Sequence, residues 1–159
     1  VDGFDANCHV TPPLRTAEDR TALRAAVARG DIAAICSDHQ PHEEDAKLAP
    51  FPATEPGISA LETLLPLTLG LVAEGEIGLS TAIERLTAGP AQNLGLPLGR
   101  LDARRAADVC VFEPDAPRVV SASTLASLGH NTPFLGQRLQ GRVSWTLLAG
   151  RIVFEREPA

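Results

Sequence analysis

Ile32-Ala33-Ala34-Ile35-Cys36-Ser37-Asp38-His39-Gln40-Pro41-His42 is the stretch of sequence that decides the fold. Its apolar run is short and rich enough in β-branched residues for a buried strand, and it stops at Asp38. Two histidines, His39 and His42, follow at once around a proline. Buried parallel strands carry ionisable groups where their carboxyl ends meet solvent, and α/β barrels and open sheets keep their chemistry there. We therefore predict a strand from Asp31 to Asp38 that ends at the edge of an active site.

Composition describes an ordinary globular protein. The chain has 159 residues, of which 44% are hydrophobic and 21% charged, and its net charge is −6. Because no basic run appears, we do not expect a surface that binds nucleic acid or an anionic membrane. No apolar stretch would span a bilayer and no signal-peptide pattern opens the chain, so we expect a cytoplasmic protein. Since the chain begins with Val1 and contains no Met, we expect it to be a piece of something longer.

The flanking sequence predicts helices around this strand. A helix should begin after Thr16 as its N-cap and end at Gly30. A long surface loop follows His42, and we expect a long apolar helix from Ile58 to Glu74, kinked at Pro66. A further helical stretch is predicted from Ser80, interrupted at Gly89-Pro90. This order suits the end of an α/β domain, because one strand cannot close a parallel sheet.

The composition changes at about residue 98. Strands are predicted at 107–114 and 118–120, and Ala149-Gly150 is typical of a hairpin turn between two further strands. We therefore divide the chain into residues 1–96, an α/β part, and residues 97–159, a small β-rich module. The three cysteines are widely spaced, so a disulfide framework is not expected, and Cys36 and Cys110 are predicted to be buried thiols.

Asp38 is the first candidate for chemistry. A carboxylate at a strand end can bind a divalent metal and can take a proton from a metal-bound water. His42, restrained by the preceding proline, could donate a hydrogen bond to an anionic substrate. His39 could either support the residues of the site without contacting the substrate or be merely structural. A zinc site needs three or more ligands, and the sequence reveals no others.

Other polar residues admit two readings. Arg15 could hold a carboxylate through its planar guanidinium, or it could pair with Asp19 on the helix surface. Gly57 could let backbone approach a ligand closely, or it could simply form a turn. His9 is predicted to lie on the surface, and His130 to be a loop residue.

Several motifs resemble those of dihydroorotases in the amidohydrolase superfamily, and they occur in the family's order. Residues 37–42 resemble the strand-eight motif, usually Thr or Ser followed by Asp-His-Ala-Pro-His. Residues 11–15 resemble Asn-Pro-Pro-Leu-Arg, and residues 56–63 resemble the glycine-bearing substrate loop and its helix. The end of the chain resembles the small β-sandwich that accompanies the family's barrel.

The resemblance implies a fold and a reaction. The fold would be α/β, with residues 1–96 as the C-terminal part of a TIM-type (β/α)8 metal-dependent barrel and residues 97–159 as a β-sandwich. The family uses zinc to hydrolyse the cyclic amide of dihydroorotate to N-carbamoyl-aspartate in pyrimidine biosynthesis. Asp38 would be the metal-binding general base. The substrate-binding residues would be His42, Thr11, Arg15, Pro56 and Gly57.

Most of the family's zinc ligands lie upstream of anything present here, so we predict that the 159-residue piece alone is inactive. Two departures also stand out: Thr11 replaces the substrate-binding Asn, and Gln40 replaces a small residue. Both features resemble dihydroorotase-like chains that have lost activity and serve as scaffolds for aspartate carbamoyltransferase. A third reading is another cyclic amidase, such as a hydantoinase or allantoinase. Because an incomplete barrel exposes apolar faces and strand edges, we also expect a homo-oligomer.

Overall fold

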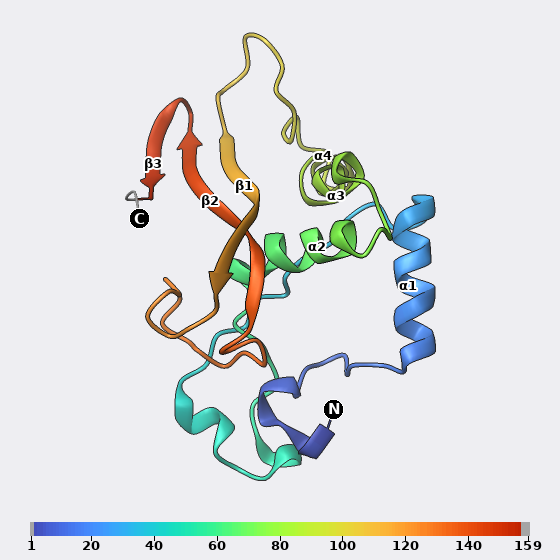
Figure 1. Ribbon diagram of the computed structural model, residues 1–159, viewed down its shortest axis with the longest axis vertical. Helices are drawn as coiled ribbons and strands as arrows, with labels where there is room; N and C mark the ends of the chain where they lie inside the picture. The colour runs from blue at the N-terminus through green and yellow to red at the C-terminus, as the bar shows by residue number, and fades with distance from the viewer. Residues whose placement is uncertain (1, 157–159) are drawn as a thin grey trace.

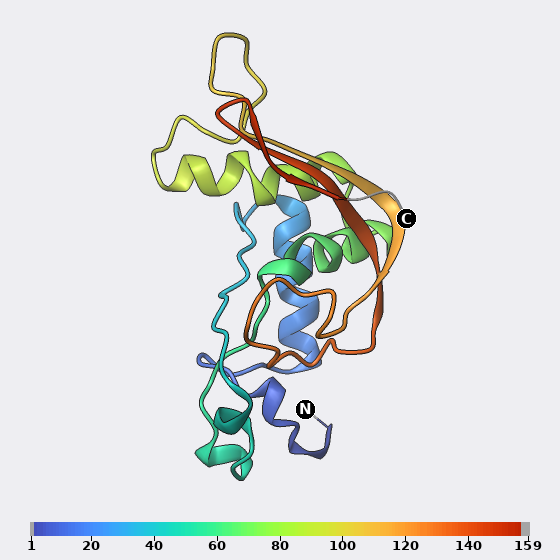
Figure 2. The ribbon, with the colours of Figure 1, turned by 90° about the vertical axis from the view of Figure 1, so that its left-hand side faces the viewer.

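The computed structural model describes residues 2–156, in which the helices lie to one side of an antiparallel sheet (Figures 1 and 2). Short 3-10 turns (η1–η5) lie in the connecting loops. In this part of the chain the longer elements are α1 (Ala17–Arg29), α2 (Leu64–Ala73), α3 (Leu79–Leu86), α4 (Ala88–Asn93), β1 (Val109–Val119), β2 (Arg138–Leu148) and β3 (Arg151–Glu155). Helix α2 crosses the middle of the molecule, between α1 and the sheet (Figure 1).

The predicted helix after Thr16 is confirmed as α1. The Thr16 hydroxyl accepts a hydrogen bond from the Asp19 backbone N–H at 3.2 Å, and the Asp19 carboxylate accepts one from the Thr16 N–H at 3.2 Å. This reciprocal pair satisfies two backbone donors that the first turn cannot use. The helix ends at Gly30, which has the left-handed conformation and donates to the carbonyls of Ala26 and Val27.

The predicted strand from Asp31 to Asp38 is wrong as a strand, although the segment is extended. An extended segment becomes a strand only when a neighbour supplies a hydrogen-bonded ladder. Among the described residues, one isolated parallel bridge joins His39 to Ile58, where the Gln40 N–H donates to the Ile58 carbonyl at 2.9 Å. This bridge sets the loop after residue 55 beside the end of the extended segment.

The predicted helix over residues 58–74 is correct only in its second half. A 3-10 turn, η5 (Leu61–Thr63), precedes α2, and Pro66 lies in the first turn of α2. The backbone nitrogens of a first turn have no intrahelical acceptor, so proline is tolerated there, and the predicted kink at Pro66 is unnecessary. Likewise α3 begins at Leu79 with Gly78, not Ser80, as its N-cap, and Gly89-Pro90 lies inside α4.

A small apolar core fixes the extended segment to the helices. Val27, Ile77 and Ala82 are buried, and partly buried side chains of the extended segment and of α2 pack against them, namely Ile32, Ile35, Leu71 and Val72. The prediction that Cys36 and Cys110 are buried is wrong, because both are exposed. Side chains point alternately to opposite faces of an extended segment. Because Ile35 points into the core, its neighbour Cys36 points to the other face.

The three strands between residues 109 and 155 form one antiparallel sheet in the order β1-β2-β3. The two predicted strands at 107–114 and 118–120 are a single strand, β1, with an irregular register between Glu113 and Pro117. The hairpin at Ala149-Gly150 is confirmed and joins β2 to β3. The predicted β-sandwich is not confirmed, because the described residues build this one sheet and leave Ile152 and Val153 of β3 exposed. The predicted module runs to residue 159, and its last three residues lie outside the described range.

None of the helices described here has both the length and the apolar character needed to cross a bilayer.

Candidate active site

Asp38 ends the extended segment and turns the chain toward the loop that follows. Its backbone is left-handed, with φ at 44°, a conformation that aspartate adopts more readily than most residues. The carboxylate is exposed, and its Oδ1 accepts a hydrogen bond from the Gln40 side-chain amide at 3.0 Å. Gln40, which departs from the family pattern, therefore contacts the predicted general base directly.

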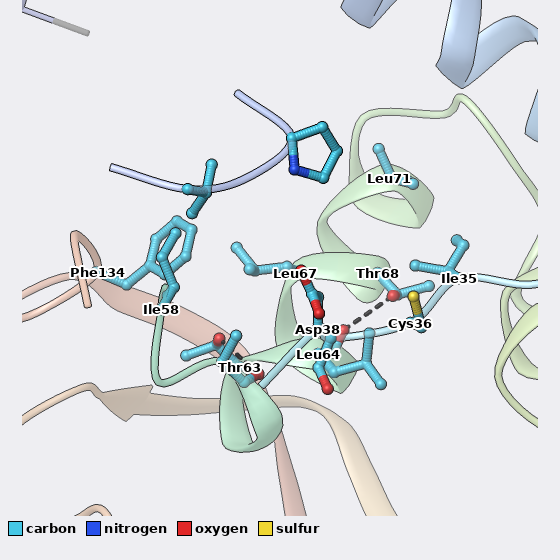
Figure 3. Close-up of a pocket in the computed structure, with 14 residues that line it drawn as sticks. Ile35, Cys36, Asp38, Ile58, Thr63, Leu64, Leu67, Thr68, Leu71 and Phe134 are labelled. Atoms are coloured by element: carbon cyan, nitrogen blue, oxygen red, sulfur yellow. Dashed lines mark hydrogen bonds between the residues drawn. The ribbon is translucent and has the colours of Figure 1, made fainter. Parts of the chain in front are cut away.

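A cavity of about 420 Å³ adjoins Asp38 (Figure 3). Figure 3 shows Asp38 beside Leu64, Leu67 and Thr68 of α2, with Ile58 and Phe134 on another wall. Asp38 is the one charged side chain among the 14 residues that line the cavity, and most of the others are apolar. A carboxylate in such surroundings is the group that would accept a proton from a molecule bound there.

His39 caps the first turn before α2. Its Nδ1 accepts hydrogen bonds from the backbone N–H groups of Ala60 and Leu61, each at 3.1 Å. Because Nδ1 accepts both bonds, it carries no proton, and the ring is the tautomer protonated on Nε2. Of the two predicted roles, the structural one fits His39.

His42, Pro56 and Gly57 lie together. The His42 Nε2 is 3.1 Å from the Pro56 carbonyl oxygen. Gly57 has φ at 142°, and a Cβ atom there would lie 2.7 Å from Gln40 Cβ and 3.0 Å from His42 Nε2. Only glycine fits such a conformation and such close neighbours. Gly57 therefore lets the loop that carries His42 pack closely against it, and the predicted close approach to a ligand stays a prediction.

His9 joins this group, contrary to the prediction that it is a surface residue. Its side chain is partly buried, and its Nδ1 is 2.8 Å from the Thr54 hydroxyl. Its carbonyl accepts the Gly57 N–H at 2.8 Å. The N-terminal segment is thereby fixed to the glycine loop.

The other predicted substrate residues stand apart from this group. Thr11 is exposed, and its neighbour Pro12 lines the Asp38 cavity. Arg15 is exposed, and its Nε lies 3.4 Å from the Asp19 carboxylate, so the surface ion pair is the reading that the structure supports. The role of Arg15 as a carboxylate-binding residue stays a prediction.

Asp38 and His42 line different cavities. His42 contributes to a second cavity, of about 690 Å³, together with loop residues that include Glu43, Glu44 and Lys47. Partial burial lowers the pKa of the Lys47 amine. The structure thus gathers His42, Pro56 and Gly57 at one position and Asp38 at an adjoining one.

Asn131 is the site residue that sequence reasoning missed. It is buried, and its side chain contacts the backbone of both the His42 loop and the glycine loop. The sequence marks it only as the neighbour of His130 in a loop. Its partners are 74 to 91 residues away, so no local pattern could reveal the contact.

The described residues do not make a metal centre by themselves. They contain no group of three or more His, Cys, Asp or Glu side chains placed to hold an ion. A zinc site requires at least three protein ligands, and this part of the chain offers Asp38 as one carboxylate. Any zinc ion would need its remaining ligands from outside the described residues.

Comparison with known proteins gives consistent matches. Residues 7–153 match the model of the amidohydrolase family. A dihydroorotase-like protein of Pseudomonas aeruginosa is 52% identical over 153 residues, which cover 96% of this chain and 36% of that protein. A dihydroorotase of Geotalea daltonii is 42% identical over 157 residues, covering 99% of this chain and 37% of that protein. This chain therefore spans about a third of the length of these relatives.

Solved structures agree with this fold. The L-hydantoinase (dihydropyrimidinase) from Arthrobacter aurescens superposes with a TM-score of 0.88 at 29% sequence identity. The match covers 98% of this chain and 36% of the hydantoinase chain.

Proposed function

Because this chain belongs to the amidohydrolase family, we propose that it is the C-terminal portion of a dihydroorotase, which hydrolyses the cyclic amide of dihydroorotate to N-carbamoyl-aspartate in pyrimidine biosynthesis. The observation that carries the proposal is the pairing of Asp38, a lone carboxylate in an apolar cavity, with an adjoining cluster of His42, Pro56 and Gly57. These are the residues that the dihydroorotase motifs single out.

Asp38 would move the proton. The oxygen of water attacks the ring carbonyl carbon while the Asp38 carboxylate takes a proton from that water. The C–N bond of the cyclic amide then breaks, and the proton passes from Asp38 to the leaving nitrogen. The reaction consumes one water and yields a carboxylic acid and a carbamoyl NH2 group, and the acid then releases its proton to solvent to become a carboxylate, so atoms and charges balance. Zinc, which members of the family use, would need ligands from elsewhere in the whole protein, as described above.

His42 and the glycine loop would bind the substrate. A histidine N–H can donate to the carboxylate of dihydroorotate, and the carbonyl oxygens of Pro56 and Gly57 can each accept a further hydrogen bond from the N–H of a cyclic amide. Gly57 carries no side chain, so the loop that carries His42 packs directly against this backbone and holds the two binding elements together. Thr11 and Arg15 enter the proposal through their motif alone, and Arg15 would have to leave Asp19 to reach a substrate.

The test is a dihydroorotase assay on the whole protein that carries this chain, with metal content measured on the same sample. We expect D38N to lower kcat by about 10²- to 10⁴-fold, the usual contribution of a positioned general base. The matched control is D45N, which removes an exposed carboxylate from the neighbouring 3-10 turn η3 (Glu44–Lys47). Turnover that survives D38N at the wild-type rate would remove Asp38 from the mechanism.

A second function is favoured by one contact. The Gln40 amide donates to Asp38 Oδ1, so one of the two carboxylate oxygens that could accept a proton is already hydrogen-bonded. The alternative proposal is therefore a non-catalytic scaffold subunit of an aspartate carbamoyltransferase complex. Exposed apolar side chains at Leu61 and Leu67 would suit an assembled state, including a homo-oligomer.

The two functions differ in their outcomes. The scaffold predicts no turnover and no bound metal, with a transcarbamoylase that co-purifies and a single larger species in light scattering. The enzyme predicts turnover that depends on Asp38. If Gln40 restrains an otherwise competent base, Q40A should raise kcat.

A further inference from the structure

Asn131 lies in the irregular segment between β1 and β2, and all of its side-chain hydrogen-bonding groups are used. It is 5% exposed. Its Oδ1 accepts the His42 backbone N–H at 2.8 Å, and its Nδ2 donates to the carbonyls of Gln40 and Gly57, each at 3.0 Å. The side chain therefore joins the loop that carries His42 to the loop that carries Gly57.

This set of partners allows one orientation of the amide. Exchanging its oxygen and nitrogen would turn an NH2 group toward the His42 N–H and an oxygen toward two carbonyl oxygens. Each such clash leaves a buried polar group without a partner, which is costly. The Asn131 carbonyl also accepts the Ser59 N–H at 2.9 Å, so its backbone is anchored to the same loop.

The segment before Asn131 packs directly on the His42 loop. A Cβ atom at Gly129 would lie 2.6 Å from Pro41 Cβ and 2.8 Å from the His42 nitrogen, so the two backbones are in contact. Glu62 fixes the approach to this contact, because its Oε1 accepts the N–H groups of Ala126 and Ser127 at 2.8 and 3.1 Å. The chain that leads to Asn131 is thus positioned both by the His42 loop and by Glu62.

We propose that Asn131 is a positioning residue that sets the spacing between His42 and Gly57 on the substrate-binding side of the site. The inference rests on the proposed function, in which those two residues contact dihydroorotate. Because the Asn131 side chain bonds to the backbone of His42, Gln40 and Gly57 and not to the Asp38 carboxylate, its loss should weaken substrate binding more than it slows proton transfer.

The experiment measures KM and kcat for dihydroorotate in the whole protein. We expect N131A to raise KM at least tenfold while kcat falls less than threefold. N131D is nearly the same size but places an oxygen against two carbonyls, so it should raise KM at least as much as N131A. N131S keeps one donor and one acceptor, provides a folded variant if N131A does not fold, and should show a smaller rise.

The matched control is T132A. Thr132 is the next residue and is 1% exposed, and its hydroxyl accepts a bond from the Phe134 N–H at 3.5 Å. We expect T132A to change stability but to leave KM within twofold of the wild type. Equal increases in KM for N131A and T132A would mean that Asn131 is merely structural, and would overturn the proposal.

Hydrogen exchange at the His42 amide gives a readout that requires no turnover. We expect it to exchange at least tenfold faster in N131A and at the wild-type rate in T132A. Unchanged exchange in N131A would overturn the positioning role even if the wild type is active. A wild type without turnover would refute the proposed reaction, and the exchange rates would then decide the role of Asn131.

Discussion

Replacing His39 tests the local structure on which the site is built. In H39A the backbone N–H groups of Ala60 and Leu61 lose the imidazole nitrogen that accepts both of their hydrogen bonds. The Ala60 donor is partly buried and leaves an unsatisfied group, whereas the Leu61 donor is exposed and can turn to water. One partly buried donor without an acceptor and one missing helix cap should together lower the free energy of unfolding by about 1–2 kcal/mol.

The size of this effect can be checked by two variants. Asparagine places its side-chain oxygen close to the position of Nδ1, so H39N should restore most of the lost stability. Glutamine reaches the position of Nε2 instead, so H39Q should resemble H39A. This difference separates the cap from any role of the ring's other nitrogen.

The assay is amide hydrogen exchange at Ala60 and Leu61 in the whole protein, with urea unfolding beside it. A loss of 1.4 kcal/mol corresponds to about tenfold faster exchange when local opening limits the rate. We expect that acceleration at Ala60 in H39A and H39Q, and little change in H39N. Wild-type exchange at Ala60 in H39A, with unchanged unfolding, would refute the capping argument.

Two further predictions concern stability. T16A removes the hydroxyl half of the α1 capping box and should cost about 1 kcal/mol in urea unfolding, whereas T21A, which removes an exposed hydroxyl from the same helix, should cost less; equal losses would contradict the cap. In the sheet, hydrogen bonds from Arg142 and Ser144 hold the pKa of Glu113 below its usual 4.5. The Glu113 carboxylate therefore contributes to the free energy of unfolding fully above pH 4.5, and this contribution is lost as the pH falls through the lower folded pKa. The difference in the free energy of unfolding between wild type and E113Q should then shrink in acid, and a pH-independent difference would contradict the linkage.

Local signals predicted the local structure well. The cap at Thr16, the helix end at Gly30 and the hairpin at Ala149-Gly150 depend on a few neighbouring residues, and the structure confirms all three. The failures have longer-range causes. The segment ending at Asp38 has the residues of a strand, but a strand also needs a partner ladder, and among the described residues one bridge at His39 is present.

The candidate site was predicted in part for the same reason. Asp38, His42 and Gly57 were proposed because their residue types occur in a recognisable order along the chain, and their roles stay predictions. Asn131 was not found, because it acts through backbone groups 74 to 91 residues away. For Arg15 a motif suggested a ligand contact, and the side chain is paired with Asp19 in this structure, so the ligand contact stays a prediction.

The contacts also indicate where the enzyme and the scaffold differ. Hydrogen bonds between the Asn131 side chain and the backbone groups of His42 and Gly57 join these three residues, and they would persist whether or not the protein turns over a substrate. Asp38 is different, because its carboxylate accepts a hydrogen bond from the Gln40 side chain, an exposed and easily broken interaction. A chain that loses catalysis can therefore keep the architecture of the binding loops and change only the environment of one carboxylate. Measurements at Asp38 and Gln40 decide between the two functions, while measurements at Asn131 report on a framework that both functions share.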